Sequence, residues 1–319
     1  MKKVVALGEL LIDFIQYGDS ENQNPLYEAN PGGAPCNFLA MLNKLKEDVS
    51  FIGKVGNDAF GEQLEKTLID AKIGIEGLIK SDTEPTTLAF VHHDEFGDRS
   101  FTFYRKNGAD AALSVDDIKE DIIEKASHFH FGTLSMTNEI CKDATLKAIN
   151  IAKENNLLIS FDPNLRENLW DDLEKAKEAF IEGFKVCNIL KIADNELSWF
   201  TGEEDLNKAI KLFREQYPID LIFLTLGKNG SKAYYKDIEV SAQTFLDIKC
   251  VDTTGAGDSF MGSAIYKILN YGIENLNQDN LKETLIFANA AASLVASKKG
   301  VINSLPNIDE INDLVKLKQ

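Results

Sequence analysis

The chain has 319 residues, of which 44% are hydrophobic and 27% charged, as in folded globular proteins with a sizeable core. Its 34 basic and 51 acidic residues give a formal net charge of −17. A surface of this charge repels phosphate backbones and anionic lipids, so we expect neither nucleic acid nor membrane as a partner.

The N-terminal segment places two lysines before an apolar run, as a secretory leader does. Glu9 and Asp13 interrupt that run, and no small-residue cleavage site follows it. Residues 2–15 (KKVVALGELLIDFI) are therefore interpreted as one short buried strand, and we expect a cytoplasmic protein. The four cysteines lie far apart without a CxxC pair, which indicates reduced thiols rather than disulfides or a zinc site.

The next segments indicate helices and strands in alternation. A Pro-Gly-Gly turn opens an amphipathic helix within 31–48 (PGGAPCNFLAMLNKLKED), and 49–56 reads as a strand before a helix over 59–73. Two β-rich segments, 86–94 and 99–105, are joined by EFG (95–97), which predicts a hairpin set apart from the main body.

From about residue 115 the alternation of strand and helix resumes. The segments in question are, in chain order, 128–135, 138–156, 157–164, 173–187, 188–193, 195–202 and 220–227. Strands separated by helices of this length favour βαβ units and a parallel sheet covered by helices on both faces. The sequence thus predicts one α/β domain over 1–319 with a small β appendage.

Ligands of such sheets bind beyond the carboxyl ends of the strands. Polar clusters follow three predicted strands: Asp13, then DPNLR (162–166), then LGKNGS (226–231). Asp13 could accept hydrogen bonds from ligand hydroxyls, although a solvated loop carboxylate is the commoner fate of such a residue.

The segment 251–266 (VDTTGAGDSFMGSAIY) carries glycine and aspartate into the start of a helix. Gly255, Ala256 and Gly257 would let backbone N–H groups approach a phosphate, and Asp258 could accept a proton from an attacking hydroxyl. A capped helix, with Asp258 only complementing the helix dipole, explains the same residues about equally well. No GxxxxGK[ST] motif is present, so a P-loop is not the phosphate holder.

Other candidates carry similar alternatives. Gly32 and Gly33 permit close approach to a ligand or merely form a tight turn, while Asn37 offers both a donor and an acceptor. Arg166 suits a sugar hydroxyl cluster or a phosphate oxygen, or else a surface ion pair. Arg105 ends the β appendage, where a lid could carry it onto a ligand.

Together these segments resemble the ribokinase-like (PfkB) family of carbohydrate kinases nearly end to end. Residues 31–45 look like the family's first signature and 251–266 closely match its second. The segments 97–110 (GDRSFTFYRKNGAD) and 161–170 (FDPNLRENLW) are most similar to the bacterial fructokinase branch. Kinases of 2-keto-3-deoxygluconate and of aminoimidazole riboside share parts of the pattern.

The resemblance implies a role for each matching residue. It implies that Asp258 is the catalytic base and that Gly255, Ala256 and Gly257 form the anion hole. The positions implied to bind sugar are Asp13, Gly32, Gly33, Asn37, Arg166 and, on the lid, Arg105. Those implied to line the nucleotide are Lys191, Thr225, Gly227, Gly230 and Asn289.

The resemblance also implies ATP, Mg²⁺ and a monovalent cation, usually K⁺. Potassium would be held at Asp252, Gly300 and Ser304, while Glu196 would organise magnesium indirectly. Ala193 stands where the family's NxxE motif has asparagine, which weakens the magnesium role of this segment. The lid, near 14–31 and 86–110, is implied to clasp a second subunit, which predicts a homodimer.

The leading expectation is an ATP-dependent sugar kinase that converts fructose to fructose 6-phosphate. A 2-keto-3-deoxygluconate or riboside kinase of the same family is the alternative. A non-catalytic sugar sensor on this fold would be expected to lack Asp258 or the glycines. A nicotinamide dehydrogenase would need GxGxxG after the first strand, where LGELLID stands.

Overall fold

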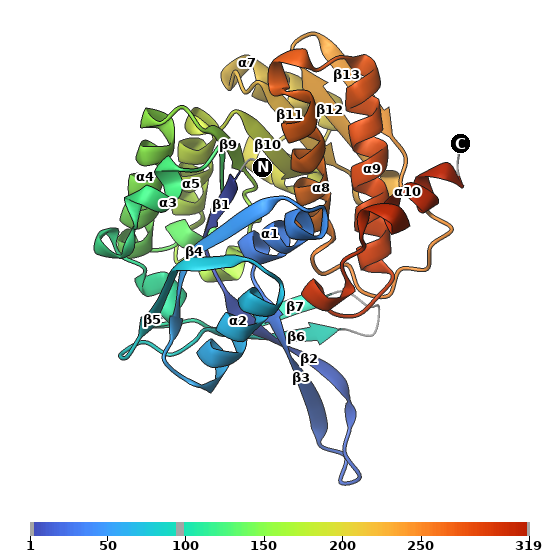
Figure 1. Ribbon diagram of the computed structural model, residues 1–319. Helices are drawn as coiled ribbons and strands as arrows, with labels where there is room; N and C mark the ends of the chain where they lie inside the picture. The colour runs from blue at the N-terminus through green and yellow to red at the C-terminus, as the bar shows by residue number, and fades with distance from the viewer. Residues whose placement is uncertain (1–2, 94–98, 318–319) are drawn as a thin grey trace.

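A nine-stranded sheet forms the centre of the computed structural model, which describes residues 3–93 and 99–317 (Figure 1). The strand order is β13-β12-β11-β10-β9-β8-β1-β4-β5. The strands are β1 (Lys3–Leu7), β4 (Asp48–Gly56), β5 (Gly74–Ser81), β8 (His128–Phe131), β9 (Leu158–Phe161), β10 (Ile189–Ala193), β11 (Leu221–Thr225), β12 (Ser231–Tyr235) and β13 (Ile238–Ala242). Every pair from β11 to β5 is parallel, while β12 and β13 add an antiparallel edge.

Helices cover both faces of this sheet, which confirms the predicted α/β architecture. Side chains of β1 alternate between two cores, since Val4 and Ala6 belong to one and Val5 and Leu7 to the other. The first core is closed by α1 (Ala34–Lys44), α2 (Ala59–Asp70), α8 (Ala256–Tyr271), α9 (Gln278–Ala296) and α10 (Ile308–Lys316). The second is closed by α3 (Glu120–Glu124), α4 (Glu139–Glu154), α5 (Leu173–Val186), α6 (Asp194–Thr201) and α7 (Leu206–Gln216).

A separate four-stranded sheet, called the lid sheet here, projects from the main body (Figure 1). Its order is β3-β2-β6-β7, with β2 (Leu11–Asp19), β3 (Pro25–Gly32), β6 (Leu88–His93) and β7 (Arg99–Tyr104). Strands β6 and β7 pair antiparallel, as the hairpin prediction requires, and its predicted connection at 95–97 lies outside the described residues.

The prediction of one strand over residues 2–15 is wrong. Strand β1 ends at Leu7 in the main sheet, and β2 begins at Leu11 in the lid sheet. The Gly8 N–H donates to the Ile52 carbonyl of β4, whereas the Ile12 N–H donates to the Thr87 carbonyl beside the lid. Both strands bury apolar side chains, so hydrophobic pattern alone did not reveal the crossing between sheets.

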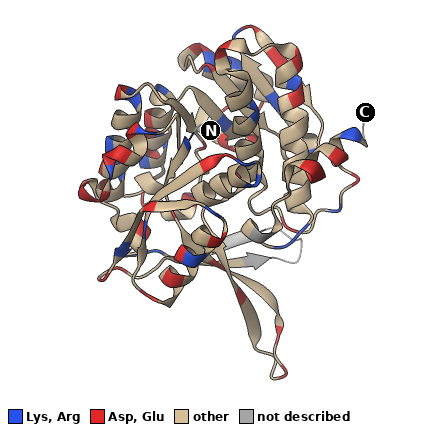
Figure 2. Ribbon diagram, in the orientation of Figure 1, with Lys and Arg blue, Asp and Glu red and all other residues tan. Residues whose placement is uncertain are grey.

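Acidic residues are spread over many helices and loops of the chain (Figure 2). The net charge is therefore not concentrated in one segment, and an anionic ligand needs a local site of favourable charge. Within 3–93 and 99–317, no helix combines the length and the apolar composition that crossing a lipid bilayer requires.

Candidate active site

A cavity of about 1070 Å³ lies where the lid sheet faces the carboxyl ends of the main strands. Its wall combines residues of β2 and β7 with the loop after β9 and the segment that leads into α8. The predicted site residues that line it are Asp13, Gly33, Asn37, Arg166, Lys191, Asp252, Gly255, Gly257 and Asp258. Residues far apart in the sequence thus meet at the sheet edge where ligands of parallel sheets bind.

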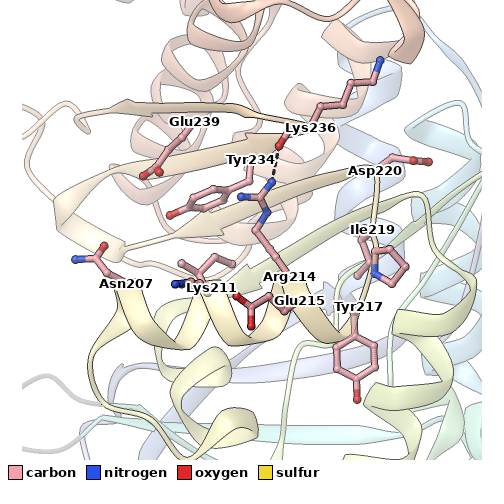
Figure 3. A pocket seen from close by; sticks show the side chains of 12 residues that line it. Asn207, Lys211, Arg214, Glu215, Tyr217, Ile219, Asp220, Tyr234, Lys236 and Glu239 are labelled. Carbon is pink, nitrogen blue, oxygen red and sulfur yellow. Dashed lines mark hydrogen bonds between the residues drawn. The ribbon is translucent and has the colours of Figure 1, made fainter.

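A second cavity, of about 760 Å³, lies between α7 and the β12–β13 edge (Figure 3). Arg214 lies over the ring of Tyr234, 5.3 Å from its centroid, and donates to the Lys236 carbonyl. Ile219 and Asp220, which precede β11, also line this cavity, so it lies at the opposite end of that strand from the carboxyl edge. None of the predicted site residues lines it.

The mouth of α8 is shaped by Gly255, which caps the helix with φ +73° before the first turn at Ala256. A Cβ on Gly255 would lie 2.3 Å from Cγ1 of Val301, so both the backbone angle and the space require glycine. Gly255 and Gly257 line the cavity, and the positive end of the helix dipole is directed there. The turn is therefore suited to an anion, as a phosphate cradle requires.

Asp258 lies in the first turn of α8, as the sequence predicts. Its Oδ2 accepts a hydrogen bond of 2.8 Å from Nδ2 of Asn37 on α1. Burial raises the pKa of the Asp258 carboxyl, while the Asn37 bond and the charges of Lys191 and Arg166 oppose that rise. A carboxylate with a raised pKa at a cavity wall is suited to accept a proton.

Asn37 also presents an unsatisfied acceptor. Its side chain is 4% exposed, and its Oδ1 has no hydrogen-bond partner among the described residues. A buried acceptor without a donor costs about 1–3 kcal/mol, and such atoms call for an explanation. Since Asn37 lines the cavity, a ligand hydroxyl would satisfy Oδ1.

Asp13 belongs to β2 of the lid sheet rather than to a loop after the first strand. Burial raises its pKa to about 7, helped by Asp252 and Asp258 and opposed by Arg166. A Cβ on Gly32 would lie within 2.2 Å of Asp13 Oδ2, so that glycine makes room for the carboxylate. Gly32 itself is not among the residues that line the cavity.

Lys191 lies in β10 and is 7% exposed, with its Nζ 3.0 Å from Oδ1 of Asp162. The same Nζ lies 3.2 Å from the position that a Cβ on Gly257 would take. A buried ammonium group therefore lies directly beside the glycine turn. Sequence reasoning did not single out Asp162, although it stands first in the DPNLR motif.

Arg105 does not line the cavity. The guanidinium is buried, with Nε donating to Asp110 Oδ2 at 2.7 Å and Nη2 to the Leu134 carbonyl at 2.8 Å. It also donates to the Thr137 hydroxyl. The residue ties the end of β7 to the main body in this structure.

The other residues predicted to line the nucleotide gather around the β11–β12 connection, outside the cavity lining. Thr225 ends β11, and Gly227 opens the short turn that leads to Gly230. Asn289 of α9 is buried, where its Oδ1 accepts from the Ser231 hydroxyl and its Nδ2 donates to the Ala242 carbonyl. Asn289 thus holds β12 and β13 next to this turn.

The residues predicted to hold cations differ in whether their oxygen atoms could bind a cation directly. Both oxygens of Glu196 already accept backbone N–H groups, from Leu165 at 2.8 Å and Ala193 at 2.9 Å. Glu196 therefore fits magnesium only indirectly, through the backbone that it holds. Asp252 lines the cavity and suits a cation with oxygen ligands, although its Oδ1 accepts from Thr254.

Gly300 and Ser304 lie in the segment between α9 and α10. Gly300 has φ +73°, and the Ser304 hydroxyl donates to the Lys299 carbonyl at 2.8 Å. Neither residue lines the cavity that contains Asp252. The carbonyl and hydroxyl oxygens of such a loop are ligands that a monovalent cation accepts.

Comparison with known proteins identifies the family of the chain. The family model for pfkB family carbohydrate kinases matches residues 1–308. Fructokinase-1 of Zea mays is 36% identical over 315 residues, which cover 98% of this chain and 97% of that protein.

Two solved structures are similar over 99% of this chain and 98% of their own. Fructokinase of Xylella fastidiosa with bound ATP has a TM-score of 0.90 at 26% identity. A double mutant of fructokinase from Vibrio cholerae O395, with fructose, ADP and a potassium ion bound, has a TM-score of 0.89 at 28% identity.

Proposed function

The chain belongs to the pfkB family of carbohydrate kinases, and on that basis we propose that it transfers the γ-phosphoryl group of ATP to the primary hydroxyl of fructose. The product is fructose 6-phosphate. The observation that carries the proposal is the buried Asp258, held by Asn37 beside the glycine turn of α8. It supplies a proton acceptor and an anion cradle at one cavity wall.

In the proposed reaction Asp258 takes the proton of the primary hydroxyl while that oxygen attacks the γ-phosphorus. The new O–P bond forms in line with the breaking bond to ADP. Charge on the transferring group is stabilised by the backbone of Gly255, Ala256 and Gly257 and by the positive end of α8. The protein performs little covalent chemistry beyond this proton transfer.

Sugar binding is assigned to the same wall, next to Asp258. Asp13 accepts from sugar hydroxyls, Asn37 Oδ1 accepts from another, and Arg166 donates to hydroxyl oxygens. Gly33 is required by the turn itself, because a Cβ there would lie 2.4 Å from the Glu9 carbonyl oxygen and its φ is +125°. Arg105 is proposed to support this wall from behind, through Asp110.

The charge of the cavity favours a neutral sugar over a sugar acid. Five acidic residues line it against two basic ones: Glu9, Asp13, Glu167, Asp252 and Asp258 against Arg166 and Lys191. Lys191 is already paired with Asp162. A substrate carboxylate, as in 2-keto-3-deoxygluconate, would meet net repulsion here. The relatives named fructokinase, at up to 36% identity, support the same choice of sugar.

We assign the nucleotide to the side of the cavity nearest β11. The proposed contacts are Lys191, Thr225, Gly227, Gly230 and Asn289. Bound Mg²⁺ would neutralise charge on the nucleotide phosphates, and Glu196 would support it through the backbone of Leu165 and Ala193. We propose that K⁺ binds at Asp252, Gly300 and Ser304, as a potassium ion accompanies the Vibrio relative.

A homodimer through the lid sheet is proposed from its aromatic face. The ring of Phe90 stacks on Phe14 at 4.9 Å, with Tyr27 and Tyr104 against its edges. Tyr104 is 65% exposed and Tyr27 36%, which leaves apolar area of this face in contact with water. A second copy of this sheet would cover that area. Sedimentation of the parent and of Tyr104→Lys tests the pairing.

The function is tested by ADP release with magnesium and potassium across a panel of acceptors. The panel holds fructose, ribose, glucose, 2-keto-3-deoxygluconate, adenosine and an aminoimidazole riboside. Saturable turnover on fructose, well above the others, supports the proposal. Turnover on a different sugar keeps the kinase mechanism and overturns fructose as the acceptor. Sugar binding without turnover on any acceptor would favour a sensor.

A further inference from the structure

Asp162 and Lys191 form an ion pair that is almost completely buried. Its atoms are 3.0 Å apart, and the two side chains are 5% and 8% exposed. Asp162 directly follows β9, and Lys191 lies in the middle of the neighbouring strand β10. Burying two charges costs several kcal/mol per ion, and replacing a buried ion pair by apolar residues of similar size often leaves the folded protein equally or more stable. A pair at this position therefore needs a reason beyond stability.

The surroundings of Lys191 supply that reason. Its ammonium lies against Gly257, in the turn that receives the transferred phosphoryl group under the proposed function. Asp162, Glu196 and Asp258 all favour its charged form, whereas burial opposes it. The ammonium is thus a fixed positive charge within reach of both the base and the anion cradle.

We propose that Asp162 is a positioning residue that holds the Lys191 ammonium at the glycine turn, where it meets the charge of the transferring phosphoryl group. Asp162 acts through Lys191 and does not touch the sugar. The inference rests on phosphoryl transfer at this site, and it does not depend on which sugar is the acceptor. A positive charge already fixed before the reaction needs no reorganisation in the transition state.

The geometry restricts where Lys191 can go without Asp162. The carboxylate supplies the only hydrogen-bond partner described for Nζ, within residues 3–93 and 99–317. His130 also lies close enough to repel the ammonium when protonated, but burial lowers the pKa of that histidine. A neutral amide at position 162 would keep the shape and remove the attraction, so Lys191 would shift toward the carboxylates of Glu196 or Asp258.

The test compares Asp162→Asn, Lys191→Met and the double variant with the parent, on whichever acceptor the parent phosphorylates. We expect each single change to lower kcat by about 10- to 100-fold and to leave the sugar KM within about twofold. The kcat of the double variant is expected to lie within about threefold of the kcat of Lys191→Met, since both substitutions act through the Lys191 ammonium.

A matched control is Asp117→Asn, which breaks the Lys54–Asp117 pair of 3.1 Å outside the cavity. This change is expected to lower the unfolding temperature while kcat stays within about twofold of the parent. A merely structural role for Asp162 would give the same pattern, and that result would overturn the inference. The inference would also be overturned if the loss of kcat in the double variant equalled the product of the losses in Asp162→Asn and Lys191→Met.

Two further outcomes keep the test decisive. If Asp162→Asn does not fold, normal kcat in Lys191→Met would overturn the inference by itself. If the parent phosphorylates no panel member, the proposed acceptor fails separately, and binding of adenylyl imidodiphosphate is measured by calorimetry. Asp162→Asn must then weaken that binding by about tenfold or more, and unchanged binding contradicts the inference.

Discussion

Replacing Asn37 with alanine is the most informative single change in the site. Asn37 donates to Asp258 through Nδ2, and this bond favours the ionised form of the carboxyl. Burial already raises the pKa of Asp258, and the Asn37 hydrogen bond opposes that rise. Without the bond, the pKa of Asp258 rises further. A base is active only when deprotonated, and the acidic limb of the pH profile therefore moves toward higher pH.

The size of the effect follows from the bond. A hydrogen bond to a charged group contributes about 1.5–3 kcal/mol, and both partners here are buried. At a fixed pH on the acidic limb, this corresponds to a loss of about 10- to 150-fold in the ionised fraction of Asp258. Asn37→Ala also loses the Oδ1 acceptor, but that loss affects sugar binding at every pH.

The assay measures kcat/KM for the sugar against pH, because this ratio reports groups of the free enzyme. Each profile is normalised to its own high-pH plateau, which removes the pH-independent loss of sugar contacts. Burial raises the pKa of Asp13 to about 7, so the comparison is repeated in the Asp13→Asn background. Burial also raises the pKa of Glu9 to about 7, but Glu9 is present in both profiles and its titration is common to them. Superimposable normalised profiles with and without Asn37 would refute the role given to the Asn37–Asp258 bond.

Two further predictions concern stability. Gly255→Ala should lower the free energy of unfolding by about 2–5 kcal/mol, from the left-handed backbone angle and the overlap with Val301. In denaturant titrations the cost should shrink in a Val301→Ala background, and an equal cost there would contradict the packing argument. Burial lowers the pKa of His128 to about 3, so the native state resists the proton that the unfolded state takes up below pH 6.5. The contribution of His128 to stability is therefore complete above pH 6.5 and should fall by about 2 kcal/mol by pH 5. An equally steep fall of stability in His128→Gln would contradict this.

The start of α8 was predictable because its determinants are local. Gly255, Gly257 and Asp258 stand within four positions, and each has its own conformational or dipole preference at a helix mouth. The alternative between a capped helix and a phosphate cradle could not be weighed locally. The observations that favour the proposed cradle come from Asn37 on α1 and Lys191 on β10, which lie beside the same turn.

Other features depended on contacts that no spacing encodes. The crossing from β1 to β2 was hidden because residues on both sides of it are apolar and buried. Arg105 was expected on the ligand, yet Asp110 and the Leu134 carbonyl hold it within the body. The Asp162–Lys191 pair follows from the adjacency of β9 and β10, so only the sheet order reveals it.

The most direct test of the account is Asp258→Asn, measured for both turnover and sugar binding. The amide keeps the size of the side chain but cannot accept the hydroxyl proton. The account predicts that kcat falls by about 100-fold or more, while calorimetric binding of the sugar stays within a few-fold of the parent. Turnover near that of the parent would contradict the assignment of Asp258 as the base.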